Sequence, residues 1–513
     1  MPAQADSPQK ERESSYGQIL KSSALIGGSQ AMNIAIGIVR TKAMALLLGP
    51  AGFGLFGLYG SVINFTQSIA GMGVNSSGVR QIAEAVGTGN DLRVAETATV
   101  LRRTSIVLGL LGALPLILFS RQISRLTFGT EARALGISIL SIAVFFTLIS
   151  GGQSALIQGT RRIAYLAKMS VLGALAGLFL SVPIVYVFRQ DGVTPALVAV
   201  AATTVATSWW YSHKIHISNV HLSLPRLREE AGSLLTLGFA FMASSMMLMG
   251  NAYAVRVILL HKVGLEATGL YQSAWTLGGL YVSFILQSMA ADFYPRLTAS
   301  AGDHENTNRL VNEQARVSLL LAGPGVLATL TFAPLVISLF YSPKFGVAVE
   351  ILRWICLGVT LQVMSWPMGF IIMANGRKYT YIFCEAAWTA VSLGLALLCI
   401  GKFGLNGAGI AFFGSYLFHV FLIYPVVGRL SGFRWSSEYV RTALPFLSLI
   451  ALVFVGFRVL PFVAAECLGA AAAILSGLYS VRTLAGLVAF DRIPWPIQKL
   501  LAWTSISRPE PSN

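Results

Sequence analysis

The chain has 513 residues, of which 55% are hydrophobic and 11% are charged, less than half the charged share of about 25% in soluble globular domains. This composition and the mean hydropathy of +0.69 exclude a water-soluble protein. The net charge of +16 would suggest a nucleic-acid partner for a soluble chain, but the Lys and Arg residues lie between apolar runs, where they orient a membrane protein. We therefore expect no nucleic-acid partner.

About fourteen apolar runs, bounded by Gly, Pro and charged residues, are each long enough to cross a bilayer as a helix of about 20 residues. In chain order they are residues 20–48, 54–79, 104–120, 134–157, 166–188, 194–212, 234–261, 267–292, 315–341, 348–373, 381–400, 405–427, 442–460 and 463–487. Because the runs are continuous rather than alternating, they predict an all-α integral membrane protein with about 14 transmembrane helices. The spans leave no room for a large soluble catalytic domain.

A sequence repeat relates two halves of the apolar region. Residues 49–56, GPAGFGLF, align with residues 264–271, GLEATGLY, at an offset of 215, and Arg40 aligns with Arg256 at 216. Two further matches at 216 join Arg80 with Arg296 and residues 160–165 with residues 376–381. The offset covers six expected helices, an even number, so both halves have the same orientation in the membrane. The repeat predicts two parallel six-helix lobes, followed by two extra C-terminal helices.

Basic residues set the expected orientation. Of the 37 Lys and Arg residues, 25 fall in the tails and loops on one side of the expected helices and 8 on the other side. By the positive-inside rule, the side with 25 faces the cytoplasm, and both termini lie there. The predicted domains are a cytoplasmic N-terminal tail at 1–19, an N-lobe of helices 1–6 at 20–212, a cytoplasmic inter-lobe linker at 213–233, a C-lobe of helices 7–12 at 234–427, the extra helices 13 and 14 at 428–490, and a cytoplasmic tail at 491–513.

One glycine motif has a literal match with a nucleotide-binding fingerprint. Residues 52–57 read GFGLFG, which would bind a pyrophosphate only between a strand and a helix of a soluble unit. An apolar run precedes it instead, so we interpret it as a tight turn between the first two helices, with Gly57 and Gly60 allowing close helix approach. The chain also has no metalloprotease, P-loop or nucleophile-elbow motif, and we expect no cofactor, no metal and no enzymatic activity.

Arg40 and Arg256 are the sharpest functional signal, because they occupy matching positions inside apolar runs. An arginine at a helix centre costs about 2.5–3.5 kcal/mol, so each is expected to face a cavity or a partner. Other polar side chains on the same or paired helices extend this candidate substrate-binding set: Asn33, Asn64, Gln67, Asn251 and Gln287. A wet central cavity between the lobes explains them economically, and scattered helix–helix hydrogen bonds are the alternative.

Four further intramembrane residues are weaker candidates: Lys42, Arg353, Glu385 and His419. Lys42 and Arg353 lie close enough to helix ends to extend into the interface, and a lone histidine in an apolar run is more often packed or in a wet cavity than a proton carrier. Glu385 lies about one turn inside its helix. Because acidic residues deep in the expected membrane are scarce, the cavity should prefer anions.

Several local motifs give the chain a family resemblance. They are LGPAGFG at 48–54, Asn75, RQIAE at 80–84 and FGLNGAG at 403–409. On these motifs, residues 18–430 or so resemble the Wzx-type oligosaccharide flippases, for O-antigen or exopolysaccharide, of the polysaccharide biosynthesis protein family in the MOP superfamily. Multidrug (MATE) exporters and the lipid II flippase are relatives of this family.

The resemblance implies a MATE-like fold and a function. The implied activity is translocation of a polyprenyl-diphosphate-linked oligosaccharide across the bacterial inner membrane for surface polysaccharide biosynthesis, by alternating access of the two lobes. Arg40 and Arg256 would then meet the diphosphate and the sugars. Membrane lipids surround such a protein, and a polysaccharide polymerase or assembly protein is a further expected partner.

The sequence also leaves other functions open. A MATE-like ion-coupled small-molecule exporter would need acidic residues in the cavity, and a lipid II-type flippase would share the fold. A membrane glycosyltransferase or polymerase would carry a large extracytoplasmic loop with catalytic groups, whereas the expected outer connections are short. A membrane scaffold would not need a polar interior.

Overall fold

The computed structural model describes residues 8–487 except 216, 218, 219, 221, 289–292 and 301, and it leaves undescribed the side chains of residues 8–24, 26, 224, 237, 240, 241, 281–288 and 295. Helices and short connections, without strands, make up this described part, so the predicted all-α membrane class is confirmed. Ten described helices are long and apolar enough to cross a membrane, or eleven with one bent pair counted as a span. Two of these segments, of 44 and 51 residues, are about twice the length that one crossing needs. The count of fourteen spans stays a prediction.

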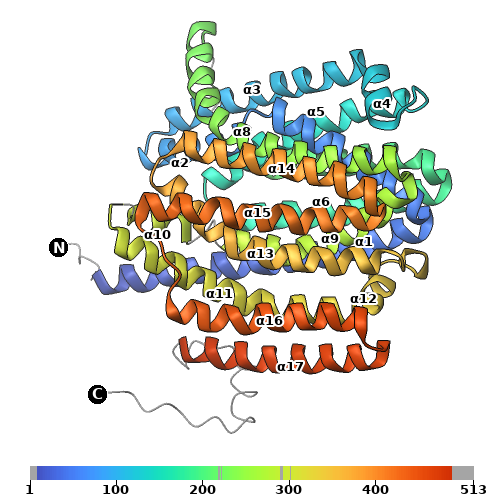
Figure 1. Cartoon of the computed structure of the whole chain (residues 1–513). Helices are drawn as coiled ribbons and strands as arrows, with labels where there is room; N and C mark the ends of the chain where they lie inside the picture. The colour runs from blue at the N-terminus through green and yellow to red at the C-terminus, as the bar shows by residue number, and fades with distance from the viewer. Residues whose placement is uncertain are drawn as a thin grey trace. The chain divides into compact units, whose positions relative to one another are not determined.

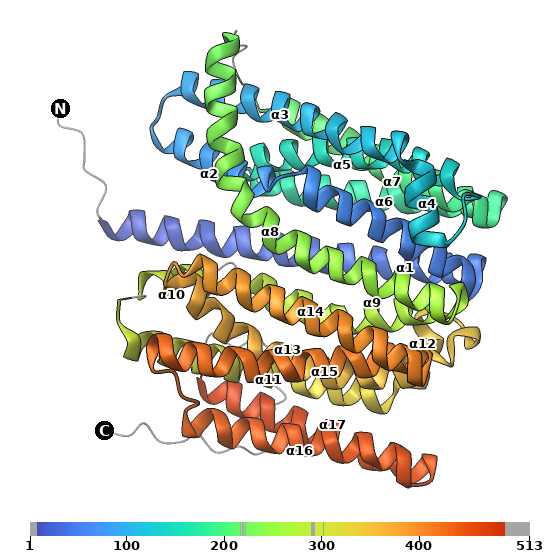
Figure 2. The ribbon, with the colours of Figure 1, turned by 45° about the horizontal axis from the view of Figure 1, so that its top comes forward.

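The chain forms two compact units, Met1–Leu270 with Phe340–Lys344 and Tyr271–Leu339 with Phe345–Asn513. The helices of the first unit are α1 (Pro8–Ala70), α2 (Val74–Gly87), α3 (Asp91–Leu118), α4 (Ser120–Phe128), α5 (Ala134–Gly159), α6 (Ile163–Phe188), the 3₁₀ turn η1 (Arg189–Gly192), α7 (Val193–His213), α8 (Leu224–Lys262) and the start of α9 (Leu265–Ser288). Helices α3 and α5 run side by side in Figures 1 and 2, and Figure 2 also shows α7 and α6 beside them in this unit. The segment predicted as an inter-lobe linker is thus helical from Leu224 onward.

The second unit continues α9 and adds eight further helices: α10 (Tyr294–Ala299), α11 (His304–Thr331), α12 (Ala333–Phe340), α13 (Ala348–Ala374), α14 (Lys378–Phe403), α15 (Leu405–Ser431), α16 (Ser437–Val459) and α17 (Phe462–Leu487). The short turn η3 (Pro343–Phe345) between α12 and α13 has its first two residues in the first unit. Helix α13 packs against both α11 and α15, and α14 covers another side of α15 (Figure 2). The predicted span 315–341 is not straight, because α11 and α12 meet at an angle of 86°.

Two glycines break the first predicted spans. Helix α1 is interrupted at Gly49, whose φ of 64° and ψ of −176° are not helical, and Pro50 begins the second half, where its missing N–H costs no hydrogen bond. The first two predicted helices are therefore separated at Gly49, whereas residues 52–57, which were predicted to form the turn, are helical. The predicted single span 54–79 is wrong, because Met72 and Gly73 have φ of 43° and 65° and α2 starts anew at Val74.

The two segments that the repeat equates cross each other reciprocally. A Cβ built on Gly54 would meet the carbonyl oxygen of Leu265 and lie 2.8 Å from the nitrogen of Gly269. A Cβ on Gly269 would meet the carbonyl oxygen of Pro50 and lie 2.8 Å from the nitrogen of Gly54. The two backbones therefore touch at equivalent glycines, as in other small-residue helix crossings. The expectation that Gly60 allows close approach is wrong, because the space around it is open.

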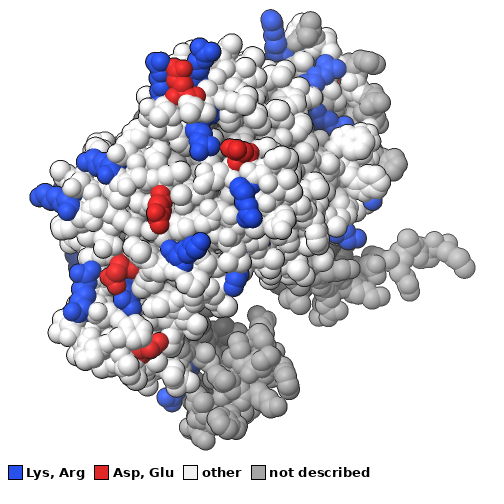
Figure 3. Space-filling view, turned by 90° about the vertical axis from the view of Figure 1, so that its right-hand side faces the viewer, with Lys and Arg blue, Asp and Glu red and all other residues white. Residues whose placement is uncertain are grey.

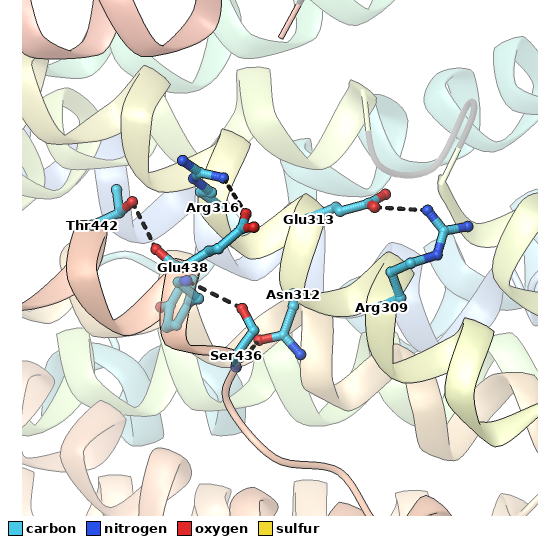
Figure 4. Close-up of polar contacts among 8 residues, drawn as sticks. Arg309, Asn312, Glu313, Arg316, Ser436, Glu438 and Thr442 are labelled. Atoms are coloured by element: carbon cyan, nitrogen blue, oxygen red, sulfur yellow. Dashed lines mark hydrogen bonds and ion pairs between the residues drawn. The ribbon is translucent and has the colours of Figure 1, made fainter. Parts of the chain in front are cut away.

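A polar junction attaches α16 to α11 in the second unit (Figure 4). Asn312 of α11 donates from Nδ2 to the carbonyl of Arg434 at 3.0 Å and accepts from the Ser436 N–H at 2.8 Å. Arg316 pairs with Glu438 at 2.6 Å, and the Ser436 hydroxyl caps α16. The extra C-terminal helices are therefore an integral part of this unit, since α17 also packs against α11 and α16.

Charged side chains are scattered over the face drawn in Figure 3, where some Lys and Arg lie beside Asp or Glu and others are surrounded by uncharged surface. Some of the first unit's charges are paired: Arg125 lies 2.5 Å from Glu131, and Arg133 lies 4.0 Å from Asp191. Exposed pairs of this kind contribute about 0–1 kcal/mol each to stability. Because these exposed pairs contribute little, the buried charges inside the helices are the ones that need a functional explanation.

Candidate functional site

Helices α1 and α8 pack against each other in the first unit and carry most of the predicted site. Asn33, Arg40, Asn64 and Gln67 lie on α1, and Asn251 and Arg256 lie on α8. The remaining member, Gln287, belongs to α9, and its side chain lies outside the described residues.

Arg40 is a half-buried charge inside a membrane-length segment. It lies nine residues before the break at Gly49, or about 13 Å along the helix axis. Within the part of the chain that the structure describes, its guanidinium makes no hydrogen bond and no ion pair. A charge in this position costs several kcal/mol unless something solvates or pairs it. Arg40 is therefore suited to meet an anion.

Arg256 has a different environment, although the repeat equates it with Arg40. Only 4% of its surface is exposed, and Nη1 donates to the carbonyl oxygen of Ala252 on the same helix at 2.7 Å. Bonding to its own helix satisfies part of the guanidinium and fixes its direction. Arg40 is thus a partly exposed charge, whereas Arg256 is buried and already hydrogen-bonded within the protein.

The polar residues on α1 fall into two groups. Asn33 donates to the Ser170 hydroxyl of α6 at 2.5 Å, while its buried Oδ1 has no hydrogen bond among the described residues. Asn64 is exposed and Gln67 is half-buried, and in the described structure neither side chain makes a hydrogen bond. Because they are three residues apart, they share one face of the helix. Asn33 therefore joins α1 to α6, whereas Asn64 and Gln67 present amides that make no hydrogen bond to a described neighbour.

Two of the weaker candidates are placed within protein contacts. Lys42 is half-buried on α1. Arg353 of α13 is 6% exposed, pairs with Glu350 at 2.7 Å, and lies 3.7 Å from the ring centroid of Phe457 on α16. Its Nε also donates to the carbonyl of Leu330 on α11 at 3.4 Å. Arg353 therefore links α13 to α11 and α16, and these contacts explain why a charged residue is buried there.

A second polar cluster lies between α14 and α15 in the second unit. His419 is 4% exposed, its ring approaches the rings of Tyr416 and Trp388 edge-on, and its Nδ1 has no hydrogen bond in the described chain. Glu385 is half-buried and likewise makes no ion pair or hydrogen bond there. The sequence interpretation missed Trp388 and Thr389, whose polar atoms are buried without a described partner. Their spacing of three and four residues from Glu385 was the available signal.

Membrane-length helices, broken by glycine and holding within a span a charge that no described residue pairs, define a multi-pass membrane transport protein. The sequence profile of the polysaccharide biosynthesis protein family matches residues 43–350, and the chain belongs to this family. Membership confirms the resemblance drawn from the glycine-rich motifs.

Curated relatives and solved structures agree with this assignment. The lipid III flippase of Escherichia coli (strain K12) is 23% identical over 405 residues, covering 78% of this chain and 95% of that protein, and the Shigella flexneri lipid III flippase gives the same values. An inward-facing multidrug resistance MATE family transporter of the MOP superfamily matches with a TM-score of 0.67 and 18% identity, covering 78% of this chain and 96% of that one. The lipid II flippase MurJ, in its inward closed conformation, matches with a TM-score of 0.65 and 13% identity, covering 91% and 99%. The chain thus has the fold of MOP-superfamily transporters.

Proposed function

We propose that this protein is a flippase that translocates a polyprenyl-diphosphate-linked oligosaccharide across the bacterial inner membrane for surface polysaccharide biosynthesis, by alternating access. Family membership, the lipid III flippase relatives and the MOP fold support a lipid-linked substrate. The observation that carries the proposal is Arg40, a charge inside a membrane segment that makes no ion pair in the described structure.

The chemistry of the site fits a diphosphate joined to sugars. Arginine binds phosphate oxygens through two parallel N–H donors, and such charge-assisted bonds are stronger where water is scarce. We assign the diphosphate to Arg40 with Arg256. The sugars are assigned to the amides of the candidate set, which both donate and accept hydrogen bonds: Asn33, Asn64, Gln67, Asn251 and Gln287.

Two other transport functions remain candidates on the same fold. A MATE-like ion-coupled exporter would use an acidic group, and Glu385, half-buried without an ion pair among the described residues, is the observation that favours it. A lipid II-type flippase would also use Arg40, because its substrate carries a diphosphate. An exporter of cations is disfavoured at the α1 site, where Arg40 would repel the cargo.

Reconstitution distinguishes these candidates. Purified protein in liposomes is given a fluorescent polyprenyl-diphosphate oligosaccharide, a lipid II-type lipid or a cationic dye, and a membrane-impermeant reductant reports the fraction that reaches the outer leaflet. We expect the oligosaccharide lipid to move faster than the lipid II-type lipid, and the dye not to move. Transport of the dye alone, driven by a cation gradient, would establish an exporter instead.

We also propose that both termini are cytoplasmic, which rests on the distribution of 25 and 8 basic residues. Reporter fusions after Arg103, Lys214 and Arg434 should read as cytoplasmic, and fusions after Arg125 and Lys344 as extracytoplasmic. An extracytoplasmic signal after Lys214 would contradict two parallel lobes at 20–212 and 234–427.

A further inference from the structure

A cavity of about 510 Å³ lies inside the first unit, lined by the second half of α1, α3, α4 and α8. Its walls include Phe65 and Ile69 of α1, Leu111 of α3, Leu126 of α4 and Tyr253 of α8. The volume is that of pockets that bind small molecules, but the lining is almost wholly hydrocarbon. The candidate site residues described above do not line it.

The position and the lining of the cavity restrict its occupant. The α3 residues in its wall, from Leu108 to Leu116, belong to a 28-residue helix that is apolar enough to cross a membrane. A sugar or a phosphate placed here would lose its hydrogen bonds to water and gain almost none from the walls. An occupant of this cavity is therefore a hydrocarbon chain.

Tyr253, in one wall of the cavity, is about one helical turn from the buried Arg256. The Tyr253 ring stacks on Phe65 with centroids 5.6 Å apart, and its hydroxyl is held by Thr127 of α4 at 2.6 Å. Arg256 follows Tyr253 by three residues, so it lies on the same side of α8, about 4.5 Å further along the axis. A positive charge thus adjoins one part of an apolar cavity, an arrangement complementary to an anionic head on a hydrocarbon chain.

We propose that this cavity binds the polyisoprenyl chain of a lipid-linked diphosphate while Arg256 attracts the diphosphate. The inference rests on the proposed function, because it names the part of the substrate that stays in the membrane. A headgroup that crosses the bilayer remains tied to its chain, and a cavity at hydrocarbon depth beside α1 keeps the chain close to the site. The pairing with Arg256 selects an anionic diphosphate lipid over a zwitterionic phospholipid.

Photolabelling of the full-length protein tests the cavity by binding rather than by transport. The probe is a polyisoprenyl diphosphate without sugar that carries a diazirine on its chain, used in nanodiscs of zwitterionic phospholipid. The variant Leu111→Trp fills the cavity from α3, and Leu110→Trp is its matched control, since residues 110 and 111 are 50% and 56% exposed and only Leu111 lines the cavity. We expect labelling of peptides from α1 and α3 to fall about tenfold in Leu111→Trp and to stay unchanged in Leu110→Trp.

Competition and a second variant complete the test. Unlabelled polyisoprenyl diphosphate should suppress labelling, and added phospholipid should not. If Leu111→Trp does not fold, Leu126→Trp fills the cavity from α4, where residue 126 is 70% exposed. Equal labelling of the filled and control proteins, or equal competition by phospholipid, would overturn the chain site even if oligosaccharide transport is found. Cavity-dependent labelling without any transport of the oligosaccharide lipid would support the chain site and refute the proposed function.

Discussion

Arg40→Glu should abolish translocation of the lipid-linked oligosaccharide while the protein still inserts and folds. The substitution places a carboxylate against an anionic substrate, and like charges brought together without water cost several kcal/mol. Its insertion cost resembles that of arginine, and no described ion pair is lost with the guanidinium. Arg40→Lys keeps the charge but loses the two-donor geometry, so partial activity is expected. The measurement is reductant-accessible fluorescent lipid in proteoliposomes, normalised to folded protein by thermal stability.

The control for Arg40→Glu is Arg121→Glu on α4. Arg121 is exposed and, within the described residues, also makes no hydrogen bond or ion pair, so its reversal changes net charge without touching the site. It should translocate at the wild-type rate. Wild-type transport by Arg40→Glu would exclude Arg40 from binding the diphosphate, and a loss that only follows the loss of folded protein would assign it a structural role.

Arg256 should behave differently from its repeat equivalent. Because it is 4% exposed and bonded to Ala252, Arg256→Glu buries a carboxylate against a carbonyl oxygen and should lower the melting temperature together with transport. The two substitutions therefore separate binding from folding. Arg40→Glu should change transport alone, whereas Arg256→Glu should change both transport and the melting temperature. Equal melting temperatures for wild type and Arg256→Glu would show that the α8 contact is not needed for stability.

Hydropathy placed most of the helices, because each apolar run must be buried in lipid or protein. It could not place the break at residues 71–73, where Gly73 takes a positive φ and approaches Gly238 so closely that a Cβ would lie 2.8 Å from its carbonyl carbon. That contact joins residues 165 positions apart, and no local pattern encodes it. The bend between α11 and α12 could not be predicted either, because hydropathy is the same for a straight and a bent apolar segment.

The candidate site was predictable as a set of residues but not as a set of environments. Arg40 and Arg256 stand out in the sequence because a charge in an apolar run is costly, and the repeat makes them appear equivalent. Only the packed structure shows that Arg256 is held on its own helix, and that the partners of Arg353 include the distant Phe457 and Leu330. Apolar residues such as Leu111 gave no signal at all, because a cavity wall and a lipid-facing surface have the same composition.

The crossing of α1 and α9 should tolerate an added methyl group poorly. Gly54→Ala and Gly269→Ala each put a Cβ against backbone of the other helix, which cannot rotate away as a side chain can, so the helices must separate. We expect each to cost about 3 kcal/mol, at the upper end of overpacking, with lower melting temperatures in detergent. Gly60→Ala, on the same helix in open space, is the matched control and should be neutral or stabilising by about 0.5–1 kcal/mol.

The double variant Gly54→Ala/Gly269→Ala makes the test specific to the crossing. Once one methyl group has forced the helices apart, the second enters space that is already open, so the double variant should cost less than the sum of the single variants. Additive losses would mean that the two glycines act independently, each through its own helix. If Gly54→Ala melts as wild type does while Gly60→Ala is destabilised, the reciprocal contact does not hold α1 and α9 together, and the equivalence of Gly54 with Gly269 is a property of the sequence repeat alone.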